Sequence, residues 1–369
     1  MKTFKVLTTA AVALILGFSS CSKEKGTDNS SAETYKVAIS LKNTATRADG
    51  VLAISGTIVD INDGYICFVS ANDAITDVYT ISNAPTSGKN ILSTDLGSTA
   101  VTLEGVPGTS AKVYMIANKG AVANFAAPVV GGTMTAYMAN NMDVRDQGDY
   151  TSVTSTGDAL LVAGGTAGTK TAAITLSTKV ARIQLKDIKF EGDVSGKIAG
   201  IFINGYYPTM QLNGTAAALV RSSIAGDYDE AGGGTIFPAA LKTFVFDDLN
   251  SKPFTAVALT PDVIEPNNAA WGYNLFVSAT PQIIIKLTDV VVGTTPLAAD
   301  QFITINGFKN NSTLDNIATL EGGMIYTIGA GAFIIKYENM SIEPGITPIN
   351  VEVTVAPVIW QETIVLPNI

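Results

Sequence analysis

The feature that most constrains the fold is a repeated alternation of apolar and polar residues with a period of two. Tyr35, Val37, Ile39 and Leu41 are apolar, and Lys36, Ser40 and Lys42 lie between or beside them. Residues 349–355 repeat the pattern near the other end of the chain. Such alternation is typical of a strand that buries one face. The pattern therefore predicts an all-β protein with half-buried strands near both ends of the chain.

Short strand candidates recur along the rest of the chain and are separated by clusters of turn-forming residues. A chain of 369 residues with 34 Gly and 14 Pro arranged in this way favours β-sandwiches, and the length favours two domains. We place the domain change near residue 178 and expect a helix or loop at residues 131–147. The other predicted strands are residues 51–61, 66–70, 78–81, 100–103, 112–118, 160–163, 172–176, 181–185, 201–204, 273–278, 282–287, 302–306, 324–328 and 362–366. The predicted turns are Asn83–Lys89, Gly105–Thr109 and Gly164–Gly168.

The first 25 residues predict export. Lys2 and Lys5 precede the apolar run Val6–Phe18, which is the organisation of a secretory signal and is too short to span a bilayer. Cys21 follows two small residues, as in a bacterial lipobox, although Phe18 stands where Leu is usual. The prediction is a signal peptide over residues 1–20 and lipidation of Cys21. The alternative is a plain secretory signal with a chance Cys.

Composition excludes several classes of function. The chain has no His, which excludes Ser-His-Asp and Cys-His catalysis and His-ligated zinc. Its net charge is −9, and removal of residues 1–47 would make it −13. An acidic chain is poorly suited to nucleic acid, whose phosphates attract Lys and Arg. Cys67 lies in an apolar run and is predicted to be buried and unreactive.

Motif searches favour turns over catalytic or metal sites. Gly192–Ile198 lacks the length and the Ser or Thr of a phosphate-binding loop, so we interpret it as a turn. Asp60–Gly64 lacks the spacing and the distal Glu of a calcium loop, and Asp227–Glu230 is interpreted as a solvated loop. No carboxylate pair stands out. The sequence predicts no metal, no cofactor and no enzymatic activity.

Segments spread along the chain resemble the FimA-type fimbrillins, the pilins of type V pili. The lipobox at Cys21 is one of them. Lys112–Asn118 resembles that family's "VYVVAN" strand, and Val180–Leu185 resembles its "VARVEL" segment. The ending Val351–Pro357, followed by Trp360, resembles "VTVTVAPW", and Leu320–Tyr326 also fits. The order and spacing of these segments support the resemblance more than any one of them.

The resemblance implies a fold and a mechanism of assembly. It implies two transthyretin-like Greek-key β-sandwich domains in tandem, at residues 48–178 and 179–369. Residues 21–47 would form a lipidated tether and a removable first strand, with Tyr35, Val37, Ile39 and Leu41 on its buried face. A trypsin-like protease would cut between Arg47 and Ala48 and free this strand.

The resemblance also implies the partners. The C-terminal strand of another subunit would fill the vacated groove, with Trp360, Ile364, Val365, Leu366 and Ile369 as donor residues. The protein would then be a pilin of a cell-surface fimbria that supports adhesion and biofilm formation and binds host or bacterial surface ligands. Before cleavage it would be an outer-membrane lipoprotein. The alternative function is a surface lipoprotein that binds glycans.

Overall fold

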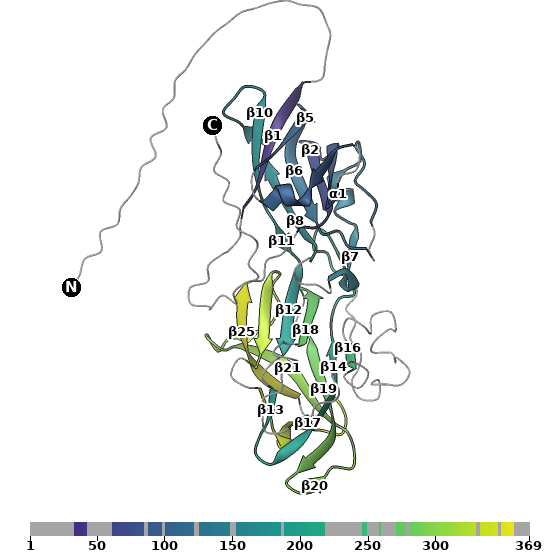
Figure 1. The fold of residues 1–369 in the computed structure, drawn as a ribbon, viewed down its shortest axis with the longest axis vertical. Coiled ribbons are helices and arrows are strands. Elements are labelled where there is room, and N and C mark those ends of the chain that lie inside the picture. The colour runs from purple at the N-terminus through teal and green to yellow at the C-terminus, as the bar shows by residue number, and fades with distance from the viewer. Residues whose placement is uncertain are drawn as a thin grey trace, which may run out of the picture.

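The structure is a computed structural model in which the described part of the chain forms an elongated β-sheet body (Figure 1). The strands of the first half occupy one end of this body, and those of the second half occupy the other. The described residues are 33–42, 61–84, 88–97, 100–121, 125–147, 153–185, 188–217, 246–248, 258–259, 271–277, 280–329, 333–345 and 348–357.

Two sheets form the first half. One has four strands in the order β5-β1-β10-β9, and the other has six in the order β11-β8-β6-β2-β3-β4. The bounds are β1 (Thr34–Lys42), β2 (Gly64–Ser70), β3 (Ile75–Ser82), β4 (Asn90–Leu92), β5 (Val101–Pro107), β6 (Ser110–Ala117), β8 (Ser155–Leu160), β9 (Val162–Ala163), β10 (Thr169–Thr175) and β11 (Ser177–Thr178).

An eleven-stranded sheet dominates the second half. Its main path runs β16-β14-β19-β21-β25-β23-β12-β18, and β17, β20 and β22 pair with members of that path. The bounds are β12 (Val180–Leu185), β14 (Val194–Asn204), β16 (Phe246–Asp248), β17 (Ala258–Leu259), β18 (Trp271–Phe276), β19 (Gln282–Val292), β20 (Thr295–Pro296), β21 (Gln301–Asn310), β22 (Asn316–Ile317), β23 (Met324–Ile328) and β25 (Pro348–Pro357). Two further strands, β13 (Ile188–Phe190) and β24 (Phe333–Ile335), pair with each other in parallel.

Helices are short in the part of the chain that the structure describes. They are α1 (Met134–Tyr137) and the 3-10 helices η1 (Ser93–Gly97), η2 (Val144–Gln147) and η3 (Tyr337–Asn339). Thr133 caps α1, because its side-chain oxygen accepts a hydrogen bond from the backbone N–H of Ala136. No helix among the described residues is long and apolar enough to cross a membrane.

The two halves are joined by a small sheet and by buried polar side chains. β7 (Asn141–Asp143) pairs with β15 (Thr209–Gln211), so a strand of each half contributes to one ladder. Asn274 in β18 donates a hydrogen bond to the backbone oxygen of Gln147, at 2.6 Å. The side-chain amide of Gln147 in turn bonds Thr154 through both of its polar atoms. Because these groups are buried, each needs a hydrogen-bond partner, and the bond from Asn274 to Gln147 supplies one across the two halves.

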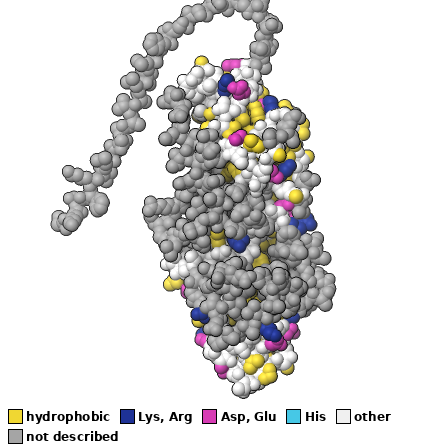
Figure 2. Space-filling view, in the orientation of Figure 1, with side chains coloured by type: hydrophobic (Ala, Val, Ile, Leu, Met, Phe, Trp, Pro, Cys, Tyr) yellow, Lys and Arg dark blue, Asp and Glu magenta, His cyan; other side chains and the backbone are white. Residues whose placement is uncertain are grey.

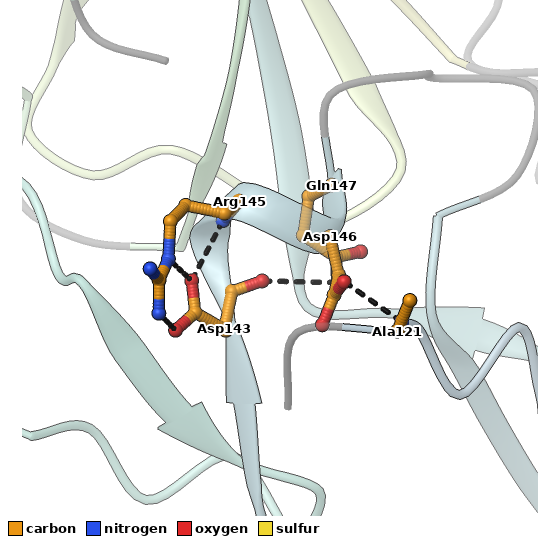
Figure 3. A network of polar contacts seen from close by, with 5 residues as sticks. All are labelled: Ala121, Asp143, Arg145, Asp146 and Gln147. Carbon is orange, nitrogen blue, oxygen red and sulfur yellow. Dashed lines mark hydrogen bonds and ion pairs between the residues drawn. The ribbon is translucent and has the colours of Figure 1, made fainter. Parts of the chain in front are cut away.

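A second polar network lies beside this joint (Figure 3). The Arg145 guanidinium donates two hydrogen bonds to the Asp143 carboxylate, at 2.9 and 2.7 Å. Burial works to raise the pKa of Asp143, but the hydrogen bonds and charge of Arg145 outweigh it and hold that pKa below its usual range. Asp146 accepts a hydrogen bond from the backbone N–H of Ala121 and so holds a neighbouring loop. The network fixes η2 at the junction.

The six-stranded sheet of the first half buries both of its faces. In β2, Ile66 and Phe68 belong to a smaller core shared with β1, whereas Tyr65, Cys67 and Val69 belong to a larger core that extends through the second half. This explains the unbroken apolar sequence of β2, since a strand covered on both faces has no polar side. On the face seen in Figure 2, Lys and Arg side chains are interspersed with Asp and Glu.

Most of the predicted strands are confirmed, and the all-β class with them. Three assignments were wrong in detail. The predicted turn Gly105–Thr109 begins later, because β5 continues to Pro107 and the turn lies at Gly108 and Thr109. Only Gly192 and Asp193 of the predicted turn Gly192–Ile198 form a turn, and Val194 begins a long strand. The candidate at residues 160–163 divides between β8 and β9.

Candidate functional site

The first strand of the described chain lies inside a sheet and not at its edge. β1 pairs antiparallel with β5 and parallel with β10, and Figure 1 shows the three strands side by side at the end of the body. Val37, Ala38 and Ile39 have partners in both neighbours. We call the space between β5 and β10, which β1 fills, the β1 slot.

The predicted inner face of this strand is the face that the structure buries. Val37 is 0% exposed and Ile39 is 1% exposed, and both belong to the smaller core. Tyr35 and Leu41 are partly buried and pack against the same core. Burial of the Val37 and Ile39 side chains stabilises the fold by about 3–6 kcal/mol in total. The alternation of Tyr35–Leu41 is therefore confirmed as a strand with one buried face.

Charged side chains of the neighbouring strands contact Lys36 and Tyr35 near the start of β1. Lys36 Nζ donates to Glu104 Oε1 of β5, at 2.7 Å. Lys170 of β10 lies over the ring of Tyr35, with its Nζ 4.1 Å from the ring centroid, and also donates to the backbone oxygen of Ser110 at 3.0 Å. The ion pair of Lys36 and Glu104 is exposed, so it orients the strand more than it stabilises it.

A β-bulge in β5 faces the start of β1. Tyr35 pairs with Val106 and Val37 pairs with Leu103, so Glu104 and Gly105 together lie opposite Lys36. Gly105 has a φ of +74°, a conformation that glycine adopts without strain. The bulge is also held from the facing sheet, because the Tyr79 hydroxyl donates a hydrogen bond to the backbone oxygen of Glu104 at 2.9 Å.

Neighbouring groups and burial shift the pKa values of Glu104, Tyr35 and Tyr79 around the slot. The hydrogen bond and charge of Lys36 hold the pKa of Glu104 below its usual range, so the carboxylate stays ionised. A hydrogen bond to Glu33 raises the pKa of Tyr35. Burial, with the charge of Asp77, raises the pKa of Tyr79 to about 12, so its hydroxyl keeps the proton that it donates to the bulge. The slot offers apolar positions, backbone ladders and fixed charges, which are the requirements for binding a strand.

The last described strand is also internal. β25 pairs in parallel with β21 over Pro348–Val353 and antiparallel with β23 over Val353–Pro357. Beside its first half lies an open groove of about 830 Å³, lined by β24, β25 and the residues around them. Phe333 is the aromatic residue among those lining it, and its side chain is buried. Among the described residues that line the groove, no aromatic side chain is exposed.

Several predicted site residues lie outside the described part of the chain. These are Cys21, Arg47, Ala48, Trp360, Ile364, Val365, Leu366 and Ile369, and the Asp227–Glu230 loop lies outside it as well. Among the described residues, no group of three or more Cys, Asp and Glu could hold a metal ion. Cys67 is buried, as predicted, and burial raises the pKa of its thiol to about 12. Its thiol therefore stays protonated and unreactive.

Sequence reasoning did not identify the residues that form the walls of the slot. Glu104 and Gly105 fell in or beside a predicted turn, Tyr79 fell in a predicted strand, and Lys170 fell between a predicted turn and the strand predicted at residues 172–176. The glycine before Val106 was a usable signal, because an isolated glycine inside a strand pattern often marks a bulge. No local signal identified β5 and β10 as the neighbours of β1, which follow β1 by about 60 and 130 residues.

No protein-family model matches the chain, and no curated protein matches it. Solved structures match it along nearly its whole length. A candidate cell adhesion protein from Parabacteroides distasonis has a TM-score of 0.51 at 13% identity, covering 90% of this chain and 98% of that chain. A second candidate cell adhesion protein, from Bacteroides eggerthii, has a TM-score of 0.49 at 17% identity, covering 92% of this chain and 100% of the other.

The tip fimbrial protein Mfa3 from Porphyromonas gingivalis, with a C-terminal truncation, has a TM-score of 0.42 at 8% identity, covering 88% of this chain and 99% of that chain. The likeness to the Parabacteroides protein shows a shared fold over nearly all of both chains. The resemblance to fimbrial and adhesion proteins that the sequence motifs indicated is thereby confirmed at the level of the fold.

Proposed function

We propose that the chain is a structural subunit of a cell-surface fimbria, that β1 is a temporary occupant of its slot, and that subunits polymerise by exchanging it. Residues 1–20 direct export, and a lipid on Cys21 holds the precursor at the outer membrane. A trypsin-like protease cuts after Arg47 and leaves Ala48 as the new first residue. The body consists of two transthyretin-like sandwiches in tandem, with the change near residue 178.

The observation that carries this proposal is the position of β1. A first strand at a sheet edge could be lost at little cost, but β1 has neighbours on both sides and two fully buried side chains, Val37 and Ile39. Removing it would leave two strand edges and an apolar trough. Open edges of this kind pair with other chains. An incoming strand would restore both ladders and fill the trough, so assembly would be strongly favoured.

The chain offers a donor of suitable composition for this slot. The segment Gln361–Ile369 follows β25 and contains Ile364, Val365 and Leu366. It lies outside the described residues, and its role as a donor is part of the proposal. The partners are accordingly other copies of this chain or related subunits. The resulting fibre would act in adhesion through host or bacterial surface ligands.

The decisive experiment blocks the cleavage. Arg47→Ala removes the positive side chain that a trypsin-like protease needs, whereas Arg47→Lys keeps it and serves as the matched control. Cells that express each variant would be sheared and the released material run unboiled on a gel. The proposal expects a ladder of polymers for wild type and R47K and none for R47A, with Ala48 as the N-terminal residue of wild-type fibres. Normal fibres from R47A would overturn it.

A second experiment tests the donor. Deleting Gln361–Ile369 should abolish the ladder while the monomer keeps its cooperative unfolding, because the described residues of the slot and of both cores remain in the truncated chain. Fibres from the truncated chain would show that another segment fills the slot.

A further inference from the structure

We propose that the bulge at Glu104–Gly105 and the charge of Lys170 fix the register of the exchanging strand, so that Ile364 and Leu366 of a second copy take the places of Val37 and Ile39. The inference rests on the proposed function, which supplies the exchange itself. It adds which residue of the tail faces which residue of the slot, and hence what the slot selects for.

The bulge makes the slot asymmetric along its length. In a regular ladder a strand can slide by two residues and recover equivalent hydrogen bonds. Here Glu104 and Gly105 lie together opposite Lys36, and the Tyr79 hydroxyl holds them there. One position of any occupant must therefore face the bulge, and this position marks the register.

The interior of the slot imposes a second condition. The positions of Val37 and Ile39 are 0% and 1% exposed, so they accept aliphatic side chains and reject a charge. An occupant needs two aliphatic residues that are two positions apart. In the tail, Ile364 and Leu366 satisfy this condition, as do Thr363 and Val365 in part.

We consider a tail that runs in the same direction as β1. If it shifts by one or two residues, it puts an unsuitable residue either opposite the bulge or in one of the two closed positions. With Glu362 in the place of Val37, a carboxylate would be buried among apolar side chains. With Thr363 there, Glu362 would lie opposite Glu104, whose carboxylate is ionised. With Val365 there, Pro367 would take the place of Ile39, a closed position paired with both neighbours, and would remove a backbone donor from the pair with Val101 of β5.

The register that puts Ile364 in the place of Val37 satisfies both conditions. It replaces the contact between Lys36 and Glu104 with a contact between Glu362 and Lys170. Ile364 and Leu366 fill the two closed positions, and Thr363 faces the bulge without a charge. Glu362 then takes the place of Tyr35, beside the Lys170 ammonium that lies 4.1 Å from the centre of the Tyr35 ring. Pro367 falls in the place of Ser40, which lies beyond the last pair that β1 makes with β5, at Ile39 and Val101, but still pairs with Ala173 of β10. In this register the β5 ladder keeps all its donors, and the β10 ladder loses one.

The slot therefore distinguishes two strands by opposite contacts. β1 presents a cation, Lys36, to Glu104. The tail presents an anion, Glu362, to Lys170 and leaves a neutral residue at Glu104. Cleavage removes the first strand, and these contacts set the position in which the second one enters.

A charge exchange tests this contact in the full chain. Lys170→Glu and Glu362→Lys should each lower the yield of fibres about fivefold, because an attractive pair becomes repulsive. The double variant should recover to within about twofold of wild type. Lys170 also bonds Ser110 within its own subunit, but that contact is not restored by a change in the tail. The control is K170E with Glu352→Lys, an exposed acid of β25, which should not rescue. If the fibre yield of the double variant falls by the product of the two single reductions, Lys170 and Glu362 do not interact and the inference is overturned.

A cross-link tests the register directly. Lys36 turns its N–H toward Gly168, so alternate residues including Ala38 form non-hydrogen-bonded pairs with β5, where side chains approach most closely. Ala38 pairs with Thr102, and the inferred register puts Val365 in its place. Thr102→Cys with Val365→Cys should yield fibres that survive boiling without reductant.

Thr363→Cys or Pro367→Cys, each combined with Thr102→Cys, should yield fibres that boiling dissociates. Fibres that cross-link through position 363 or 367 and not through 365 would overturn the register while leaving strand exchange intact. Absence of fibres from wild type would overturn the proposed function, and the register with it.

Discussion

β1 and β25 are the first and last strands of the described chain, and their surroundings are alike. Each lies inside a sheet between one parallel and one antiparallel neighbour, and each alternates apolar and polar residues. They differ in how the neighbours are distributed. β1 is paired on both sides at Val37, Ala38 and Ile39. The first part of β25 pairs with β21 and the last part pairs with β23, so only Val353 has partners on both sides.

The cores beneath the two strands differ as well. Val37 and Ile39 belong to the smaller core, which is confined to the first half. Val351 and Val353 belong to the larger core, which extends through both halves. Removing β1 would open one trough at the end of the body, whereas removing β25 would open the main core. An internal strand over a small, separate core can therefore be removed with less damage to the fold than one over the main core, which is what the proposed exchange of β1 requires.

The largest expected effect comes from truncating one buried side chain in each strand. Ile39→Ala and Val353→Ala should each lower the free energy of unfolding by about 2–4 kcal/mol, because each leaves a cavity. Urea unfolding measures this loss. Hydrogen exchange should separate the two variants, since I39A should expose amides of β5 and β10 by local opening, and V353A should lower protection throughout. If I39A and V353A changed hydrogen-exchange protection in the same strands by the same amount, β1 would not open independently of the rest of the fold.

The bulge offers the next effect. Gly105→Ala should lower the free energy of unfolding by about 1–2 kcal/mol, because a φ of +74° strains a residue with a Cβ. No atom lies within 4 Å of the added Cβ, so the loss is conformational and not steric. Gly165→Ala is the control, since it also adds a Cβ in open space but has no positive φ, and should change little. A neutral G105A would show that the bulge does not depend on glycine.

Removing the hydroxyl that holds the bulge should have a smaller effect. Tyr79→Phe deletes the hydrogen bond to the Glu104 carbonyl and should cost about 1 kcal/mol. Tyr326→Phe is matched to it, because the Tyr326 hydroxyl accepts a hydrogen bond from the backbone N–H of Glu321 in the other half. Both should lower stability, but only Y79F should speed hydrogen exchange in β1. Faster exchange in β1 from Y326F would contradict the separation of the two cores.

The smallest effect is a dependence on pH. The pKa of Glu104 is lower in the folded protein than its ordinary value of 4.5, so its contact with Lys36 stabilises β1 above that value and is lost as the pH falls through the folded pKa. Hydrogen exchange in β1, corrected for intrinsic rates, should quicken below pH 4.5 at low salt. Glu104→Gln should remove this dependence, and high salt should weaken it. An unchanged pH profile in E104Q would assign the effect to another carboxylate.

The sequence predicted the site unevenly, and the reason is physical. The inner face of Tyr35–Leu41 was predictable because alternation is written in adjacent residues. The predicted turn at Gly105–Thr109 was wrong in its start because glycine serves both a turn and a bulge, and only the opposing strand decides between them. Glu104 and Lys170 had no local signal, since their importance comes from lying beside Lys36 and Tyr35 in space.

The sequence by itself determined that the chain is built of strands, that Val37 and Ile39 face inward, that histidine chemistry is absent and that Cys67 is buried. These properties depend on composition and on a period of two, which any local stretch displays. Only the tertiary structure decided that β1 fills a slot between β5 and β10, over a core of its own and against a bulge. Strand pairing joins residues far apart in the chain, and their choice of partner depends on the whole set of competing pairings.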